Sequence, residues 1–214
     1  MTWVSARSES GQAAPLYITA VAGLLFLALV FFAFGQADVT RNGTQSAAEA
    51  AALAAAKESR DRFADDFLMS ILDPDYLEAV FNGDVIGTAN GCQAAGRYAV
   101  QNKAEMQECH WVSGGRWGFT VKVQSQDSMG TSIVEGTDNK HAVTQATALV
   151  EPRCAFERND QGDKPDDGDV GEGAAQPVSP GELVCDGGTW DIDPENLKLL
   201  PDIADLFTVR LAKD

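Results

Sequence analysis

The stretch that decides the fold is Gly11–Ala37, GQAAPLYITAVAGLLFLALVFFAFGQA, which contains no charged residue. Its part from Pro15 to Phe34 is almost wholly apolar. A helix needs roughly 20 apolar residues to cross a bilayer core about 30 Å thick. Inside lipid, a single span can satisfy its own backbone only as a helix. The sequence therefore predicts a transmembrane helix over residues 13–37.

A cleaved signal peptide is the alternative interpretation, because Gly35-Gln36-Ala37 has the small-x-small form of a cleavage site. The apolar run is longer than the roughly 7–15 residues of a signal-peptide core. That length favours an uncleaved anchor. A helix buried in a soluble core is a third interpretation, and the sequence favours it least.

The charge balance excludes some classes of partner. The chain has 214 residues, with 16 basic and 32 acidic side chains and a net charge of −16. Nucleic-acid binding requires Lys and Arg against phosphates, so no nucleic-acid partner is expected. Docking on anionic lipid head groups is also disfavoured, because they attract basic side chains and repel acidic ones. The balance fits a solvated domain outside the cell, or one that meets cations.

All four cysteines, Cys92, Cys109, Cys154 and Cys185, follow the span. An even number of cysteines in a chain with a membrane or export signal predicts disulfides. Of the three possible pairings we favour Cys92–Cys109 with Cys154–Cys185, although the sequence alone leaves the pairing open. We expect a single-pass cell-membrane protein with a cytoplasmic N-terminus and an extracytoplasmic C-terminal domain.

The helical pattern continues beyond the span, through a segment rich in strong helix formers from Gln45 to Leu72. We expect one helix from about residue 14 to residue 72, bent near Gly35 or Gly43. Its larger apolar residues recur at helical spacing, at Leu53, Phe63, Phe67 and Ile71.

The alanine tract, residues 47–56, forms a smooth cylinder that another helix can approach closely. One interpretation is that the tract packs against the chain's own domain. The other is that it packs laterally against copies of the chain or a partner, and the two are compatible. The predicted helix-packing surface consists of Ala47, Ala48, Ala51, Ala52 and Ala55.

After this helix the sequence predicts a small α+β domain with an antiparallel sheet. Asp73 is suited to cap a helix that ends at Asn82-Gly83. Gly114-Gly115 indicates a two-residue hairpin turn, followed by alternation of apolar and polar residues over Arg116–Gln124. Further elements are expected as a helix over 91–107, strands over 132–135, 143–151, 189–193 and 207–211, and a helix over 194–207 interrupted by Pro201.

Residues 156–184 are predicted to be a disordered acidic loop, because they are rich in acids, glycine and proline. Tested as an EF-hand from Asp163, the loop has Pro165 at position 3 and Ala174 at position 12, so the calcium-binding pattern fails. A solvated linker is the favoured interpretation. Weak, nonspecific cation binding is the alternative.

No constellation for catalysis or for a cofactor is visible. The two histidines, His110 and His141, are not in a zinc-binding spacing, and the cysteines do not form CxxC pairs. No nucleophile elbow, SxxK or phosphate-binding loop is present. We therefore expect no metal, no cofactor and no enzymatic activity.

Two blocks of sequence carry a resemblance to a known family. The first joins Gly11-Gln-Ala-Ala-Pro-Leu-Tyr and the apolar span to FFAFGQADVTRNGTQSAAEAAALAAAKESRD. It resembles the N-terminal region of bacterial TadE/TadG-like proteins of Flp/Tad pilus assembly. The second, LVCDGGTWDIDPENLKLLPDIADLFTVRLAKD, resembles the C-terminus of an actinobacterial TadG-related subgroup.

The resemblance implies a pilin-like fold and a membrane-anchored, pseudopilin-like component of a Tad/Flp pilus assembly or secretion machine. It implies partnership with other pilus subunits or a secretion platform, possible self-association, and no catalysis. Prepilin-type motifs carry Glu five residues after the cleavage-site glycine, and the matching position here is Leu16. We therefore expect an uncleaved anchor.

Two other functions remain as alternatives: a membrane-anchored extracytoplasmic ligand- or cation-binding module, and a secreted hydrolase with an unrecognised site. The expected organisation is a cytoplasmic leader (1–12), a transmembrane helix (13–37), an Ala-rich helical extension (38–72), an α+β extracytoplasmic domain (73–155), the acidic loop (156–184) and the C-terminal part of the domain (185–214).

Overall fold

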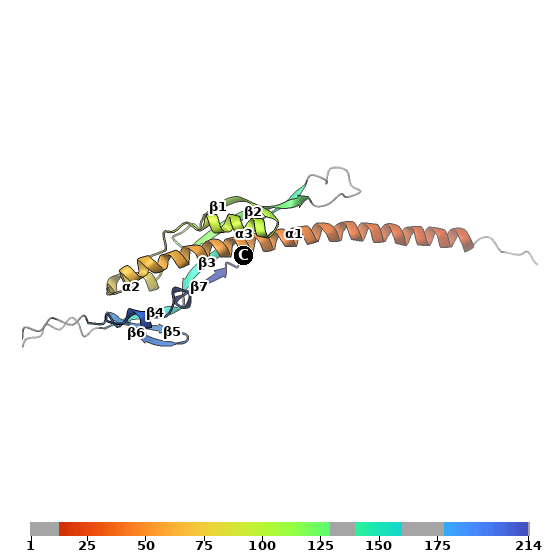
Figure 1. The fold of residues 1–214 in the computed structure, drawn as a ribbon. Helices are drawn as coiled ribbons and strands as arrows, with labels where there is room; N and C mark the ends of the chain where they lie inside the picture. Colours follow the sequence, from red (N-terminus) through yellow and green to blue (C-terminus); the bar gives the residue numbers. More distant parts are fainter. Residues whose placement is uncertain (1–12, 129–139, 160–177, 214) are drawn as a thin grey trace, which may run out of the picture.

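The computed structural model describes residues 13–128, 140–159 and 178–213. One helix, α1 (Ala13–Met69), runs the length of the molecule, and the rest of the chain packs around its second half (Figure 1). It passes through Gly35 and Gly43 without interruption. The single long helix predicted from about 14 to 72 is confirmed.

The remaining elements form a mixed helix and antiparallel-sheet domain, which confirms the predicted α+β class. In chain order they are α2 (Pro74–Phe81), α3 (Cys92–Gln101), β1 (Ala104–Trp111), β2 (Gly118–Ser128), β3 (His141–Pro152), β4 (Cys154–Arg158), β5 (Gly181–Cys185), β6 (Gly188–Asp191), a 3-10 turn η2 (Leu197–Leu199), α4 (Ile203–Leu206) and β7 (Phe207–Leu211).

The main sheet has four antiparallel strands in the order β1-β2-β3-β7, and α1 packs on one of its faces. In β2, Phe119, Val121 and Val123 are fully buried on this face. The intervening residues lie on the open face, where Lys122 makes an ion pair with Glu108 across to β1. The alternation read from the sequence therefore marks the buried face of this sheet.

Buried aromatic rings extend the core beyond the sheet. Phe63 of α1 lies edge-on to Trp117 and to Phe207, with ring centroids 5.0 and 5.9 Å away. The indole N–H of Trp117 donates a hydrogen bond to the Ser59 hydroxyl, 3.0 Å away, so its one polar atom is satisfied inside the core. These contacts hold α1 to the hairpin turn and to β7.

The second sheet, β4-β5-β6, is smaller and lies beside α2 (Figure 1). The Arg158 guanidinium of β4 makes ion pairs with Asp75 and Glu78 of α2. Leu183 and Ile192 are fully buried and belong to the same apolar cluster as the residues under the main sheet. The second sheet is thus joined to the rest of the domain by an apolar contact and by exposed ion pairs.

Several element boundaries agree with the sequence analysis. Asp73 caps α2, accepting hydrogen bonds from the backbone of Asp75 and Tyr76, and Pro74 is the first residue of the helix. The hairpin also forms, with Gly114 and Gly115 at φ values of +82° and +73°. Its turn is longer than two residues, because the last backbone bond before it joins the Val112 N–H to the Gly118 carbonyl.

Three expectations need correction. The helix expected over 91–107 ends at Gln101, because Lys103 adopts a φ of +57° and the chain reverses into β1. The loop expected over 156–184 is shorter, because β4 and β5 pair at its base. The helix expected over 194–207 is reduced to η2 and α4, separated at Pro201. The strand expected over 132–135 lies outside the described residues.

We predict that Gly91→Ala lowers stability strongly. A Cβ at Gly91 would lie 1.9 Å from the Ala55 carbonyl oxygen, so α3 would have to move away from α1. Overpacking of this kind costs about 1–3 kcal/mol. Gly96→Ala in the same helix is the control, because its Cβ would be 3.6 Å from the nearest atom and alanine is the better helix former. Equal midpoints of thermal unfolding for the two variants in detergent would contradict this packing.

We also predict that each disulfide contributes to stability. The linked residues are 17 positions apart for Cys92–Cys109 and 31 for Cys154–Cys185. Loop-closure entropy corresponds to about 3 kcal/mol for the first and about 4 kcal/mol for the second. Replacing each pair by serine should lower the free energy of unfolding in urea by these amounts. A loss below about 1 kcal/mol for either pair would contradict the loop-closure account.

Candidate functional site

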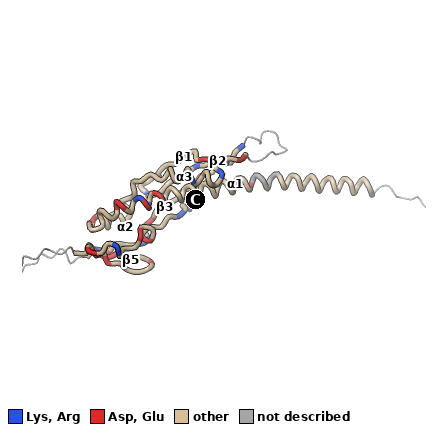
Figure 2. The backbone as a smooth tube through the Cα atoms, viewed as in Figure 1, with Lys and Arg blue, Asp and Glu red and all other residues tan. Residues whose placement is uncertain are grey.

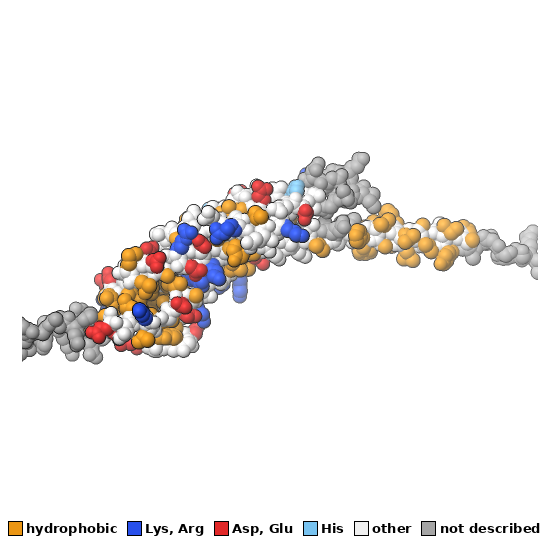
Figure 3. All heavy atoms as spheres, in the orientation of Figure 1, with side chains coloured by type: hydrophobic (Ala, Val, Ile, Leu, Met, Phe, Trp, Pro, Cys, Tyr) orange, Lys and Arg blue, Asp and Glu red, His pale blue; other side chains and the backbone are white. Residues whose placement is uncertain are grey.

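The most exposed apolar surface of the molecule is the first half of α1. One helix is long and apolar enough to cross a membrane, by length and composition: Ala14–Phe32, with 19 residues, a mean hydropathy of 2.3 and no part buried in the fold. Eleven large apolar side chains between Leu16 and Phe32 are exposed. Figure 3 shows hydrophobic side chains all along the helix that projects from the folded domain. Soluble monomers rarely expose contiguous apolar patches above a few hundred Å².

A short stretch of α1 separates this exposed apolar segment from the domain. We refer to residues 33–43 as the stalk. Its Val39 side chain is 72% exposed, whereas Thr44, at the start of the domain, is 3% exposed. From Phe32 to Thr44 the helix rises by about 18 Å, at 1.5 Å per residue. The polar layer on each side of a bilayer is about 5–8 Å thick. The stalk is therefore long enough to carry the domain clear of the lipid head groups.

The alanine tract begins where the stalk ends. Ala47, Ala48, Ala51, Ala52 and Ala55 all have 0% exposure. They are covered by α3 and by the sheet of the same chain. The close helix approach expected of them is made within the domain. A second subunit could reach these side chains only if α3 or the sheet moved away.

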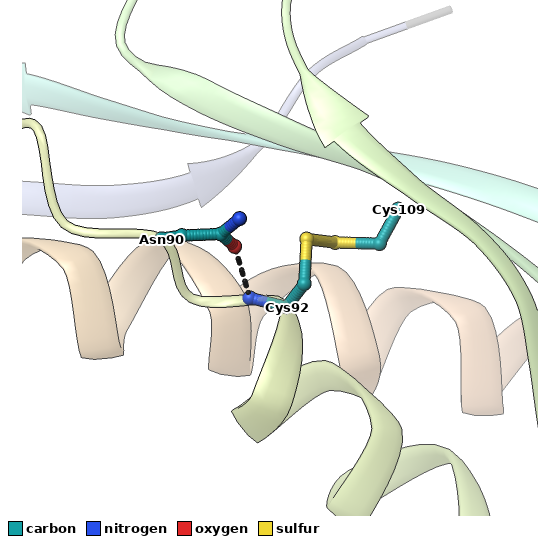
Figure 4. Close-up of a disulfide and its surroundings, with 3 residues drawn as sticks. All are labelled: Asn90, Cys92 and Cys109. Atoms are coloured by element: carbon teal, nitrogen blue, oxygen red, sulfur yellow. Dashed lines mark hydrogen bonds between the residues drawn. A yellow bond between two sulfur atoms is a disulfide. The ribbon is translucent and has the colours of Figure 1, made fainter.

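The structure forms both disulfides favoured from the sequence. Cys92–Cys109 joins the start of α3 to β1, with the two Cα atoms 5.8 Å apart. Figure 4 shows that the side chain of Asn90 accepts a hydrogen bond from the Cys92 N–H, 2.8 Å away, where the chain enters α3. Cys154–Cys185 joins opposed residues of β4 and β5, at the base of the acidic segment.

One stabilising residue had no distinguishing signal in the sequence. Arg60 is 8% exposed, although arginine is rarely buried. Its guanidinium makes an ion pair with Asp61 and donates a hydrogen bond to the Phe207 carbonyl, 3.3 Å away. Arg60 thereby joins α1 to β7. It stands among other charged residues in the sequence, so only the structure reveals its partner.

The described residues offer little to catalysis or to metal binding. No group of three or more His, Cys, Asp or Glu side chains among them could hold a metal ion. His110 is on β1 and His141 on β3, where its Nδ1 is hydrogen-bonded to the Ser125 carbonyl. The EF-hand candidate from Asp163 to Ala174 lies outside the described residues.

The shifts in pKa have structural causes. Hydrogen bonds to Asp75 and Glu78 raise the pKa of Arg158, and a hydrogen bond from Lys122 lowers the pKa of Glu108. Burial raises the pKa of Tyr76, and the negative charge of Asp66 adds to the effect. The first two groups belong to surface ion pairs rather than to an enclosed cleft.

An apolar pocket of about 290 Å³ lies between α2, the Gly114-Gly115 turn and the end of β3. Its two charged lining residues are Arg116 and Glu151, and Glu151 is engaged in an ion pair with Arg210. The lining contains no serine, cysteine or histidine, so it presents no nucleophile paired with a base. This pocket does not form an active site of a recognised kind.

Comparison with known proteins finds one family model that matches the exposed helix. The Tad family model, described as Flp pilus-assembly TadE/G-like, matches residues 11–58. No curated protein and no solved structure matches the chain. The match does not extend to residues 183–214, so the resemblance of that stretch to an actinobacterial subgroup stays a prediction.

The matched residues include the exposed span, the stalk and the alanine tract. The match links the chain to Flp pilus assembly and is to a family of assembly components, not to an enzyme family. Over residues 11–58 the chain is similar to TadE/G-like Flp pilus-assembly proteins.

Proposed function

We propose that this chain is a membrane-anchored, pseudopilin-like component of a Tad/Flp pilus assembly or secretion machine, acting by subunit interaction rather than by catalysis. The observation that carries the proposal is the continuity of α1. One helix contains a fully exposed apolar span, the stalk and the alanine tract, and the family match covers all three.

The energetics of the span support a membrane anchor. Each exposed leucine or phenylalanine side chain gains about 1.5–3 kcal/mol on leaving water, and eleven large apolar side chains of the span are exposed. Cleavage after Ala37 would cut inside α1, which is helical from Ala13 to Met69. Both points favour an uncleaved anchor over a signal peptide.

The disulfides support an extracytoplasmic location for the domain. All four cysteines are paired, and both pairs lie after the span. Disulfides form and persist in oxidising compartments and are rare in the cytosol. With a single span, this orientation places the N-terminus in the cytoplasm.

The span and stalk are the surfaces through which we propose that the chain meets its partners. The alanine tract is already covered by the domain, so we assign the contact with pilus subunits to residues 14–43 of α1. The proposed partners are the membrane, other Tad/Flp pilus subunits or a secretion platform, and a second copy of the chain.

A cross-linking experiment tests this assignment of surfaces. A cysteine at Val39, which is 72% exposed, should be captured by a bis-maleimide linker together with a second pilus subunit in cell membranes. A cysteine at Ala51, which is 0% exposed, should not.

Val143→Cys is the control for exposure, because Val143 is 50% exposed on the open face of the sheet. Capture from residues 51 or 143 but not from 39 would contradict the proposed use of the stalk. Capture of lipid alone at residue 39 would contradict subunit interaction through it.

The N-terminus and mass of the mature protein test the anchor. We expect a chain from the membrane fraction that begins at residue 1 or 2. Without reductant it should be lighter than its reduced form by four hydrogens, because it contains two disulfides. A start after Gly11 would indicate prepilin-type processing and contradict the uncleaved anchor. A start at Asp38 would indicate a secreted domain and contradict the membrane function.

A further inference from the structure

Exposed apolar side chains also gather at the far end of α1. Outside the span, nine large hydrophobic residues are exposed in the described part of the chain, and four of them belong to this end. Leu68, Met69 and Leu72 are 49%, 78% and 46% exposed, and Leu199 on η2 is 73% exposed. Single exposed apolar residues are ordinary, but a group of them marks an interaction site.

A groove of about 260 Å³ lies between the last turns of α1 and the segment from η2 to α4. Leu68 lines it, and Leu199 stands between the lining residues Lys198 and Leu200. Leu68 and Ile71 line it from α1, and Leu200 and Ile203 line it from the opposite side. The groove is open to solvent, and its surface is largely apolar. It therefore presents a preformed concave surface to an apolar side chain from outside.

One carboxylate lines this groove and two more lie near it in the chain. Asp202 is part of the lining, Asp65 lies three residues before Leu68 on α1, and Asp205 lies on α4. All three are exposed, and none forms an ion pair with another residue in the described ranges. Lys198 is the basic residue of the lining. Figure 2 shows acidic residues over this end of the domain, around α2 and β5.

The position of the groove excludes the anchoring membrane as its occupant. Leu68 is 36 residues beyond Phe32 on one continuous helix, which corresponds to about 54 Å along the helix axis. Lipids that surround the span cannot reach that far, and a carboxylate rim would repel anionic head groups. The occupant must come from another molecule that meets the domain at its outer end.

We propose that this groove is a docking site for a segment of another protein whose apolar side chains are flanked by Lys or Arg. Apolar side chains would fill the groove between Leu68 and Ile203, and the basic residues would pair with Asp65 and Asp202. Complementary charge around an apolar contact is the usual arrangement of a protein interface. The site is distinct from the span and stalk, so it does not rest on the function proposed above.

The experiment uses the full-length chain in detergent micelles, with a benzophenone amino acid at residue 199. The probe is a short amphipathic helical peptide of leucine and lysine, and the same peptide with glutamate in place of lysine is the control. We expect light-induced cross-linking of the Leu/Lys peptide at residue 199. Cross-linking should be much weaker at residue 143, where Val143 is similarly exposed but lies away from the groove.

Matched variants separate binding at this groove from attraction to the chain's overall negative charge. Asp65→Asn with Asp202→Asn should reduce the affinity of the peptide about fivefold, from the loss of two exposed charge pairs. Asp84→Asn with Glu157→Gln removes the same charge elsewhere and should leave the affinity unchanged. Leu68→Ser should weaken binding, whereas Val143→Ser should not.

Equal losses in both double variants, or equal cross-linking at residues 199 and 143, would overturn the proposal, because the peptide would then be responding to net charge alone. Cross-linking of residue 199 to a second copy of the chain, to detergent, or equally to the glutamate peptide would also overturn it. A negative result with the peptide would not affect the capture of subunits at Val39. The test of the groove and the test of the proposed function can therefore fail independently.

Discussion

Along the alanine tract, the close packing of α1 against α3 and the sheet requires side chains no larger than a methyl group. At Ala47, Ala48 and Ala51 the exposed fraction is zero because the other elements press directly on the helix. The backbone at Gly91 approaches the carbonyl of Ala55 so closely that no Cβ fits between them. Everything after α1 depends on this contact, because it holds α3, and through Cys92–Cys109 also β1, on the helix.

The same helix meets different surroundings along its length, and its composition changes accordingly. Its first half carries large apolar side chains that no part of the fold covers. Its second half carries alanine where another helix must approach, then Phe63 and Phe67 where the core widens. The two halves differ in side-chain size rather than in helix propensity. One regular backbone therefore serves two different environments.

Much of the fold follows from local patterns in the sequence. The span, the capped start of α2 and the strand Phe207–Leu211 each depend on residues that are close together in the chain. The end of α3 could not be read in this way, because residues 102–107 also suit a helix and the pairing of β1 with β2 decides the outcome. Similarly, β4 and β5 lie in polar sequence and exist through pairing across the acidic segment.

The candidate site was predicted less completely than the fold. The span was evident from its composition. The role of the alanine tract was not, because small side chains suit packing within a domain and packing between subunits equally well. Only the position of α3 and of the sheet shows that the alanine tract is covered by its own domain. The groove beside Leu68 could not be predicted either, because Leu200 and Ile203 reach it from about 130 residues further along the chain.

The stalk has a mechanical consequence. A flexible linker over the twelve residue steps from Phe32 to Thr44 would have a root-mean-square length of about 20 Å and would absorb displacements of similar size. An unbroken helix has no such slack, because stretching it breaks backbone hydrogen bonds along its axis. A force that draws the apolar half of α1 along the helix axis is therefore transmitted directly to the sheet domain. Along this axis the two halves of the helix move together.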